Sequence, residues 1–230
     1  IYQCDWSSDV CSSDLACKLH ARNYSKKFIS KSVIKLSQFD INLTRNITWI
    51  NAMPNKLRLY MNQFHHVDSH LCITFNRTSH NILIRNFFKA ISRLGDGIFW
   101  YSLMALMLVV AQEKALLPVI HMSIAGLTGT IVYKWLKVRT LRPRPFKVHQ
   151  QISLRSIPLD QFSFPSGHTL HAVIFSMIAI HYFPMLSVVL LPFTFLIGLS
   201  RPILGLHYPS DVLVGALIGA LISTISFYMI

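Results

Sequence analysis

Charged side chains are scarce in this 230-residue chain. Lys, Arg, Asp and Glu together make up 13% of it, about half of the ~25% that is typical of soluble domains. Residues 162–200 contain none of these four types at all. Long uncharged runs of this kind are typical of a polytopic membrane protein, so the composition argues against an ordinary soluble domain.

Cysteine and acidic residues are also few. Of the four cysteines, two lie in the first fifteen residues, and Cys17 and Cys72 form neither a disulfide framework nor a metal-ligand spacing. No grouping of His, Cys and carboxylates has the spacing of a metal site, so we expect metal-independent chemistry without a cofactor. The net charge of +13 favours membrane lipid headgroups or phosphate substrates as partners. No nucleic-acid motif is present, so no nucleic-acid partner is expected.

The first sixty residues do not resemble a membrane domain. The segment DVCSSDL at residues 9–15 back-translates to an oligonucleotide that resembles a common sequencing adapter, so residues 1–15 are set aside as a foreign sequence. Residues 16–60 are polar and basic. They fit either a native basic extension or untranslated sequence read in frame, with the natural start at Met53 or Met61. The lack of a signal peptide or a spanning segment there favours the second interpretation.

Residues 61–230 are predicted to form one all-α membrane domain, a transmembrane helical bundle of about five spans. Residues 61–95 are expected to form one or two amphipathic helices at the membrane surface, or else a solvated helix that packs on the bundle. Pro184 interrupts the longest apolar stretch, and Gly215 and Gly219 have the spacing of a close helix contact. The predicted spans are residues 98–112, 115–133, 169–183, 185–200 and 212–230.

Three polar clusters lie at the ends of these spans. They are Lys137 with Arg144-Pro145, then Pro165-Ser166-Gly167-His168, then Ser200-Arg201 with His207 and Asp211. Counting membrane crossings puts all three clusters on the same side. Because hydrocarbon strongly penalises such groups, we interpret them as one functional site.

The cations and the serine-glycine turn are suited to binding phosphate. Lys137, Arg144 and Arg201 combine planar guanidinium forks with a mobile ammonium charge. Ser166 and Gly167 begin a predicted helix, where a hydroxyl and backbone N–H groups can point at an anion. Together these groups can surround the oxygens of a phosphoryl group.

Two histidines and one aspartate can supply the chemistry. His168 would lie beside the phosphate, placed to protonate the leaving oxygen. If a helix starts near Pro209, His207 and Asp211 share one of its faces. The carboxylate would then fix the imidazole tautomer and leave the other ring nitrogen free to attack phosphorus. The alternative is a purely structural His–Asp cap at the helix start.

Other polar residues nearby are given ordinary interpretations. We expect Arg139, Arg142 and Lys147 to be cations that face lipid headgroups. Loops such as residues 146–164 are expected to set the choice of headgroup; for Asp160 in this loop, a solvated turn is favoured over a contribution to that choice.

Jointly, the clusters resemble the three-part pattern of the type-2 phosphatidic acid phosphatase superfamily, which also includes vanadium haloperoxidases. That pattern is Lys-x6-Arg-Pro, Pro-Ser-Gly-His and Ser-Arg-x5-His-x3-Asp, and every position is filled between residues 137 and 211. The resemblance implies that His207 is a nucleophile that forms a phosphohistidine, that Asp211 orients it, and that His168 is first the acid and then the base. It also implies that the phosphoryl oxygens are held by Lys137, Arg144, Ser166, Gly167 and Arg201.

The same resemblance implies a substrate class and a location. Bacterial membrane members act on lipid phosphates or diphosphates such as undecaprenyl diphosphate, phosphatidylglycerophosphate or phosphatidic acid. Their active site faces away from the cytoplasm, so we expect a bacterial inner-membrane protein with its site toward the periplasm or exterior. Members commonly have six spans, whereas about five are predicted here. A first span encoded upstream, or a shorter subtype, would account for the difference. The alternatives are a vanadate-dependent haloperoxidase and a non-catalytic lipid-binding membrane protein; the oligomeric state is not specified.

Overall fold

The computed structural model describes residues 55–156, 158 and 160–229. Apart from the first turns of α2, which precede Gln63, the features below lie in one compact unit, Gln63–Ile230. The expectations for residues 1–15 and for residues 16–54 lie outside the described residues.

The described elements are the helices α2 (Asn55–Thr78), α3 (Ile82–Leu94), α4 (Ile98–Ala111), α5 (Glu113–Thr140), α6 (Pro145–Val148), α7 (Gly167–Tyr182), α8 (Ser187–Ile203) and α9 (Pro209–Phe227), with a 3₁₀ turn η1 (Pro184–Leu186) before α8.

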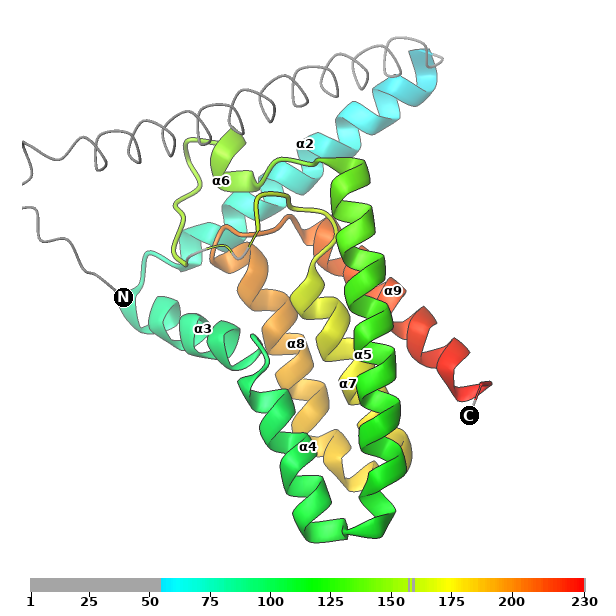
Figure 1. Cartoon of the computed structure of the whole chain (residues 1–230). Coiled ribbons are helices and arrows are strands. Elements are labelled where there is room, and N and C mark those ends of the chain that lie inside the picture. The colour runs from blue at the N-terminus through cyan, green and yellow to red at the C-terminus, as the bar shows by residue number, and fades with distance from the viewer. Residues whose placement is uncertain (1–54, 157, 159, 230) are drawn as a thin grey trace, which may run out of the picture. The chain divides into compact units, whose positions relative to one another are not determined.

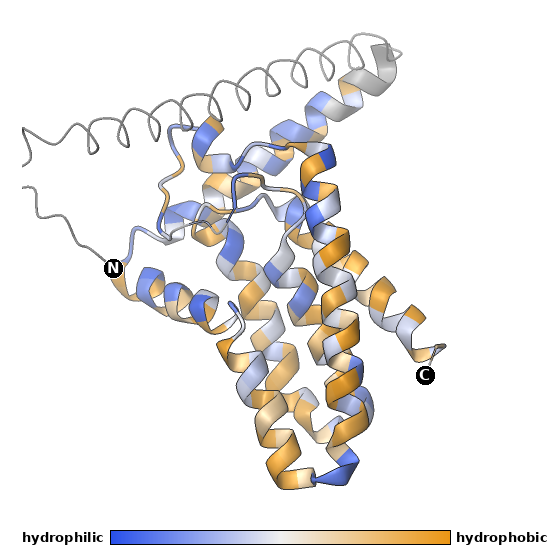
Figure 2. Cartoon of the chain, viewed as in Figure 1, coloured by the Kyte–Doolittle hydropathy of each residue, from blue (hydrophilic) through white to orange (hydrophobic). Residues whose placement is uncertain are grey.

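Helix α7 is the centre of the bundle, because it packs against α5, α8 and α9. Its apolar side chains form the core together with residues of α4, α5 and α8, among them Trp100, Met122, Leu170, Ile174, Ile178 and Ile197. Large apolar side chains are also exposed on α4, α5, α8 and α9, and these helices are largely coloured as hydrophobic in Figure 2. An apolar exterior of this kind suits helices that contact lipid.

Several helices of the described part are long and apolar enough to cross a membrane. They are α5, the segment Pro184–Ile203 and α9, and the pair α3 and α4 makes a fourth if its two halves, bent by 53°, count as one span. Helix α7, with 16 residues, is shorter than the ~20 residues of a typical straight span. The chain is therefore an all-α integral membrane protein with three or four candidate spans, and the count of about five stays a prediction.

The ends of four helices come together at one end of the bundle. α5 and α8 end there and α7 and α9 begin there (Figure 1). α5 extends to Thr140, seven residues beyond the predicted span, and ends where Leu141 adopts a left-handed conformation with φ of 50°. Lys137 therefore lies on the last turn of a helix instead of in a loop. All three polar clusters meet at this end.

Gly215 and Gly219 bring α9 against α7, so the predicted close helix contact is confirmed. A Cβ atom at Gly215 would lie 2.6 Å from the carbonyl oxygen of Ser166, and one at Gly219 would lie 2.6 Å from that of Leu170. The backbone N–H of Ser166 also donates to the carbonyl oxygen of Asp211 at 3.0 Å. The two glycines thus place the turn before α7 directly beside the start of α9.

Candidate active site

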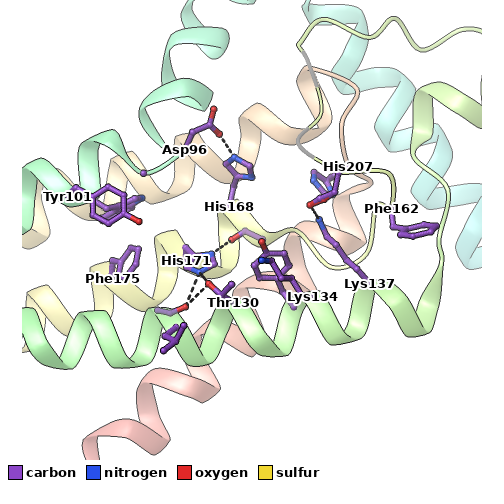
Figure 3. A pocket seen from close by; sticks show the side chains of 18 of the residues that line it. Asp96, Tyr101, Thr130, Lys134, Lys137, Phe162, His168, His171, Phe175 and His207 are labelled. Carbon is purple, nitrogen blue, oxygen red and sulfur yellow. Dashed lines mark hydrogen bonds and ion pairs between the residues drawn. The ribbon is translucent and has the colours of Figure 1, made fainter. Parts of the chain in front are cut away.

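A cavity of about 980 Å³ opens at this end of the bundle (Figure 3). Its polar wall includes four of the candidate residues, Lys137, Arg144, His168 and His207, and the backbone of Gly167. Its other wall is largely apolar and comes from α4, α5 and α7, through residues such as Trp100, Tyr101, Met104, Leu127 and Phe175. The cavity therefore joins a cationic, histidine-bearing end to a surface that suits a hydrocarbon chain.

His207 lies in the connection between α8 and α9, and only 1% of it is exposed. Its Nδ1 faces the Oδ2 atom of Asp211 at 3.6 Å, and its Nε2 lies 3.5 Å from a terminal nitrogen of Arg144. The helix starts at Pro209, as predicted, and Asp211 also caps it, because its Oδ2 accepts a hydrogen bond from the backbone N–H of Tyr208 at 2.9 Å. One carboxylate therefore faces the imidazole and caps the helix, so the structural cap is present and the catalytic role of the pair stays a prediction.

Lys137 and Arg144 are buried cations that meet at Asp160. The Nζ of Lys137 lies 2.5 Å from the Asp160 carboxylate, and Nε of Arg144 donates to the Asp160 carbonyl oxygen at 2.9 Å. The interpretation of Asp160 as a solvated turn was wrong. The loop folds back over α5, where the desolvated ammonium of Lys137 favours a carboxylate partner.

Arg201 completes the set of buried cations near the end of α8. One terminal nitrogen donates to the hydroxyl of Ser92 on α3 at 2.6 Å. Its buried Nε has no hydrogen-bond partner among the described residues. Arg201 thus has donor capacity left for an anion.

His168 lies in the first turn of α7 and lines the cavity. Its Nε2 makes a short contact with the carboxylate of Asp96 (Figure 3). Asp96 lies in the turn between α3 and α4, flanked by Gly95 and by Gly97, whose φ is +124°. We did not predict a role for Asp96, although a lone acid between two glycines just before an apolar run is a signal that points to a shaped turn.

Ser166 is the N-cap residue of α7 and is fully buried. Its hydroxyl lies 3.0 Å from that of Thr169. Gly167 follows it and contributes backbone to the cavity wall. The turn therefore brings the start of the helix to the cavity, where its backbone N–H groups favour an anion.

Arg142 is half-buried and paired with Asp211 and Asp68, so the interpretation of Arg142 as a lipid-facing cation was wrong. Its two terminal nitrogens bond to Asp211 at 2.6 Å and to Asp68 of α2 at 2.7 Å, and its guanidinium lies 4.1 Å from the centre of the Tyr208 ring. The carbonyl oxygen of Arg142 also accepts from the backbone N–H of Ser163 at 2.8 Å. The chain turns inward after α5, which the spacing of the cations alone did not indicate.

Burial lowers the pKa of His207 to about 3, the carboxylate of Asp211 opposes this shift, and the charges of Arg144 and Arg201 add to it. The imidazole is therefore neutral at pH 7, with a lone pair available on one ring nitrogen. Burial also lowers the pKa of Arg144 from its usual 12.5. Among the described residues, no group of three or more His, Cys, Asp or Glu side chains is arranged to hold a metal ion.

Known proteins that are similar to this chain include two phosphatases from Bacillus subtilis and LpxE from Aquifex aeolicus. Undecaprenyl-diphosphatase BcrC of Bacillus subtilis (strain 168) is 34% identical over 110 residues, which cover 48% of this chain and 56% of BcrC, so the match spans about half the length of that relative. The crystal structure of LpxE from Aquifex aeolicus superposes with a TM-score of 0.59 at 30% identity, covering 69% of this chain and 93% of LpxE. A transmembrane PAP2-type phosphatidylglycerolphosphate phosphatase from Bacillus subtilis shares the fold, with a TM-score of 0.53 at 20% identity over 85% of this chain and 94% of that one.

The family resemblance seen in the three polar clusters is confirmed by these comparisons. The family model for the PAP2 superfamily matches residues 118–230, which include all three clusters. With the similarity to LpxE over nearly all of that protein, this match shows that the chain belongs to the PAP2 superfamily.

Proposed function

We propose that this chain hydrolyses a lipid-linked phosphate monoester or diphosphate by two successive in-line transfers through His207. The observation that carries the proposal is the convergence of Lys137, Arg144, His168 and His207 on one cavity. Buried cations stabilise charge on a transferring phosphoryl group, and a neutral imidazole beside them is a suitable nucleophile.

In the first transfer, Nε2 of His207 attacks phosphorus while the bond to the leaving oxygen breaks. His168 donates its proton to that oxygen, so the lipid leaves as an alcohol or, from a diphosphate, as a phosphate. Lys137, Arg144 and Arg201 hold the equatorial oxygens. Asp211 stabilises the cationic imidazole that results.

In the second transfer, water attacks the phosphohistidine. His168, now neutral, accepts a proton from that water, and the P–N bond breaks to return His207 and release inorganic phosphate. Ser166 and Gly167 present the start of α7 to the phosphoryl oxygens throughout. No metal ion is assigned a step.

The apolar wall of the cavity supports a lipid substrate. Trp100, Met104 and Phe175 offer contact area for an acyl or prenyl chain beside the cationic end. Two of the similar proteins, an undecaprenyl-diphosphatase and a phosphatidylglycerolphosphate phosphatase, are named as enzymes of lipid phosphates. We place the protein in a bacterial inner membrane with this cavity toward the periplasm or exterior, which a reporter fused after α9 can test.

Phosphate release by the purified protein in detergent tests the proposal. The substrates are phosphatidic acid, phosphatidylglycerophosphate and undecaprenyl diphosphate. We expect release from at least one of them, inhibition by vanadate, no effect of EDTA, and no release by His207→Ala. Release that persists in His207→Ala, or a folded protein that acts on none of the three lipids, would contradict it.

A further inference from the structure

A buried ionic network lies directly behind Asp211, and two of its members are outside the three polar clusters. Asp68 comes from α2, which precedes the region matched by the PAP2 family model, and its side chain is 4% exposed. Arg142 comes from the connection after α5, and its side chain is 18% exposed. Neither residue touches the cavity, so the mechanism above leaves both without a role.

The side chains alternate in charge along a continuous path. Asp68 accepts from one terminal nitrogen of Arg142 at 2.7 Å, and the other terminal nitrogen donates to Oδ1 of Asp211 at 2.6 Å. The opposite oxygen of Asp211, Oδ2, is the one that faces Nδ1 of His207. One terminal nitrogen of Arg142 thus holds Oδ1, while the Ser163 hydroxyl and the Tyr208 backbone N–H hold Oδ2, so the carboxylate keeps one rotation and presents Oδ2 to the imidazole.

Asp68 also holds the backbone at the start of α9. Its Oδ1 accepts from the backbone N–H of Ser210 at 3.0 Å, and its Oδ2 accepts from the hydroxyl of Ser210 at 2.5 Å. Ser210 immediately precedes Asp211. α2 itself is fixed to the bundle by Asn76, whose amide donates to the carbonyl oxygen of Ile203 at 2.9 Å. The position of Asp211 is thus determined from both its side chain and its backbone.

Stability alone does not account for such a network. Burying three charged groups carries a desolvation penalty that apolar residues of similar size would avoid. A fully partnered network does fix one geometry, and a nucleophile misplaced by 1 Å can lose about 10²-fold in rate. Two carboxylates around one guanidinium also carry a net negative charge, and this charge stabilises the cationic imidazole of the phosphohistidine.

The geometry points to Asp68 and Arg142 as positioning residues that hold Asp211, and through it His207, in place for phosphoryl transfer. The inference rests on the proposed function, because it assigns His207 the nucleophilic role. It adds α2, a segment outside the matched family region, to the machinery that sets up the reaction.

Two conservative variants test this role. Arg142→Lys keeps the charge but loses the fork, and Asp68→Asn keeps the size but loses the charge. Arg139→Lys is the matched control, because Arg139 lies nearby on the exposed side of α5, over the ring of Trp135. For each protein, kcat, KM and the inhibition constants of vanadate and inorganic phosphate are measured on the same lipid substrate.

Comparing inhibition by vanadate with inhibition by inorganic phosphate distinguishes a positioning role of Asp68 and Arg142 from a purely structural one. If vanadate mimics the pentacoordinate state of the proposed transfer, its binding requires a bond from Nε2 of His207, whereas inorganic phosphate requires only Lys137, Arg144 and Arg201. We expect kcat to fall by roughly 10- to 100-fold in both variants with KM within about threefold. Vanadate inhibition should weaken by about tenfold while phosphate inhibition is unchanged, and Arg139→Lys should match the wild type. The double variant should be no worse than the poorer single variant, since both residues act through Asp211.

Other outcomes would overturn the inference. Wild-type kcat and vanadate inhibition in both variants would show that the network has no effect on His207. A parallel loss of vanadate and phosphate inhibition would show that it only supports the fold of the site. If Arg142→Lys does not fold, Asp68→Asn decides the question by the same comparison. A wild-type protein without phosphatase activity would instead refute the proposed function, which is a distinct result.

Discussion

His207 and Asp211 face each other across 3.6 Å, between Nδ1 of the imidazole and Oδ2 of the carboxylate. Nδ1 is buried and has no hydrogen-bond partner within the described part of the chain. Oδ2 accepts from the backbone N–H of Tyr208 and from the hydroxyl of Ser163. A full hydrogen bond needs an approach to about 3 Å, so the pair is set to tighten when the imidazole becomes cationic.

The buried imidazole should make the protein less stable in acid. Burial lowers the pKa of His207 from 6.5 to about 3, with Arg144 and Arg201 contributing and Asp211 opposing. Between these two pH values the unfolded chain binds more protons than the folded one. The contribution of neutral His207 to the free energy of unfolding is therefore complete above about pH 6.5 and is lost as the pH falls toward 3. We expect the Tm in detergent to fall from pH 7 to pH 4, and the fall to be smaller in His207→Asn. Equal pH dependence in the two proteins would contradict this assignment.

Asp160 forms an ion pair with Lys137, a cation that the proposed substrate needs. Its carboxylate lies 2.5 Å from Nζ of Lys137, so an incoming phosphate must compete with it. Asp160→Asn should therefore tighten inhibition by inorganic phosphate by roughly 3- to 10-fold, as expected for a partly exposed ion pair. Asp160→Glu, which keeps the charge, is the control. Weaker phosphate inhibition in Asp160→Asn would instead make the carboxylate part of the binding site.

The role assigned to His168 predicts a dependence on the leaving group. His168→Ala should lower kcat/KM, which reports the first transfer and not the later attack of water, by at least about 10²-fold with a lipid phosphate, because the departing alkoxide needs a proton. The loss should be much smaller with an aryl phosphate whose phenolate leaves unaided. Asp96→Asn removes the carboxylate beside His168 and should show the same pattern more weakly. Equal losses on both substrates would exclude His168 as the acid.

The contact between α7 and α9 should be sensitive to a single methyl group. Gly219→Ala puts a Cβ 2.6 Å from the carbonyl oxygen of Leu170, and overpacking of this kind costs about 1–3 kcal/mol of the free energy of unfolding. Gly198→Ala on α8 is the matched control, since its nearest neighbour, a methyl group of Val212, is at an ordinary 3.4 Å. Thermal unfolding of the two variants compares them directly. A similar Tm in both would refute the tight α7–α9 contact.

Much of the bundle could be predicted because its signals are local. Uncharged runs and Pro184 located the apolar helices, and Gly215 with Gly219 indicated their closest contact. The order and spacing of the polar clusters identified the family. Local signals could not settle whether α7, which is short, crosses the membrane as a full span.

The supporting residues of the site could not be predicted because their partners are distant in the sequence. Asp68 and Arg142 are 74 residues apart, and Asp96 and His168 are 72 apart. In the sequence, Asp68, Asp96 and Arg142 look like ordinary surface charges, because their partners come close only when the chain folds back on itself. Arg142 was misinterpreted for this reason, since its spacing from Arg139 resembles a row of headgroup-facing cations.

The central claim is that a phosphoryl group passes through His207, and a trapping experiment tests it most directly. The purified protein is mixed with a lipid phosphate labelled at phosphorus, quenched within milliseconds, and analysed for label on the protein. We predict an acid-labile, alkali-stable phosphohistidine on His207 in the wild type and no label in His207→Ala. Label on another residue, or turnover without any labelled protein at every quench time, would contradict the account.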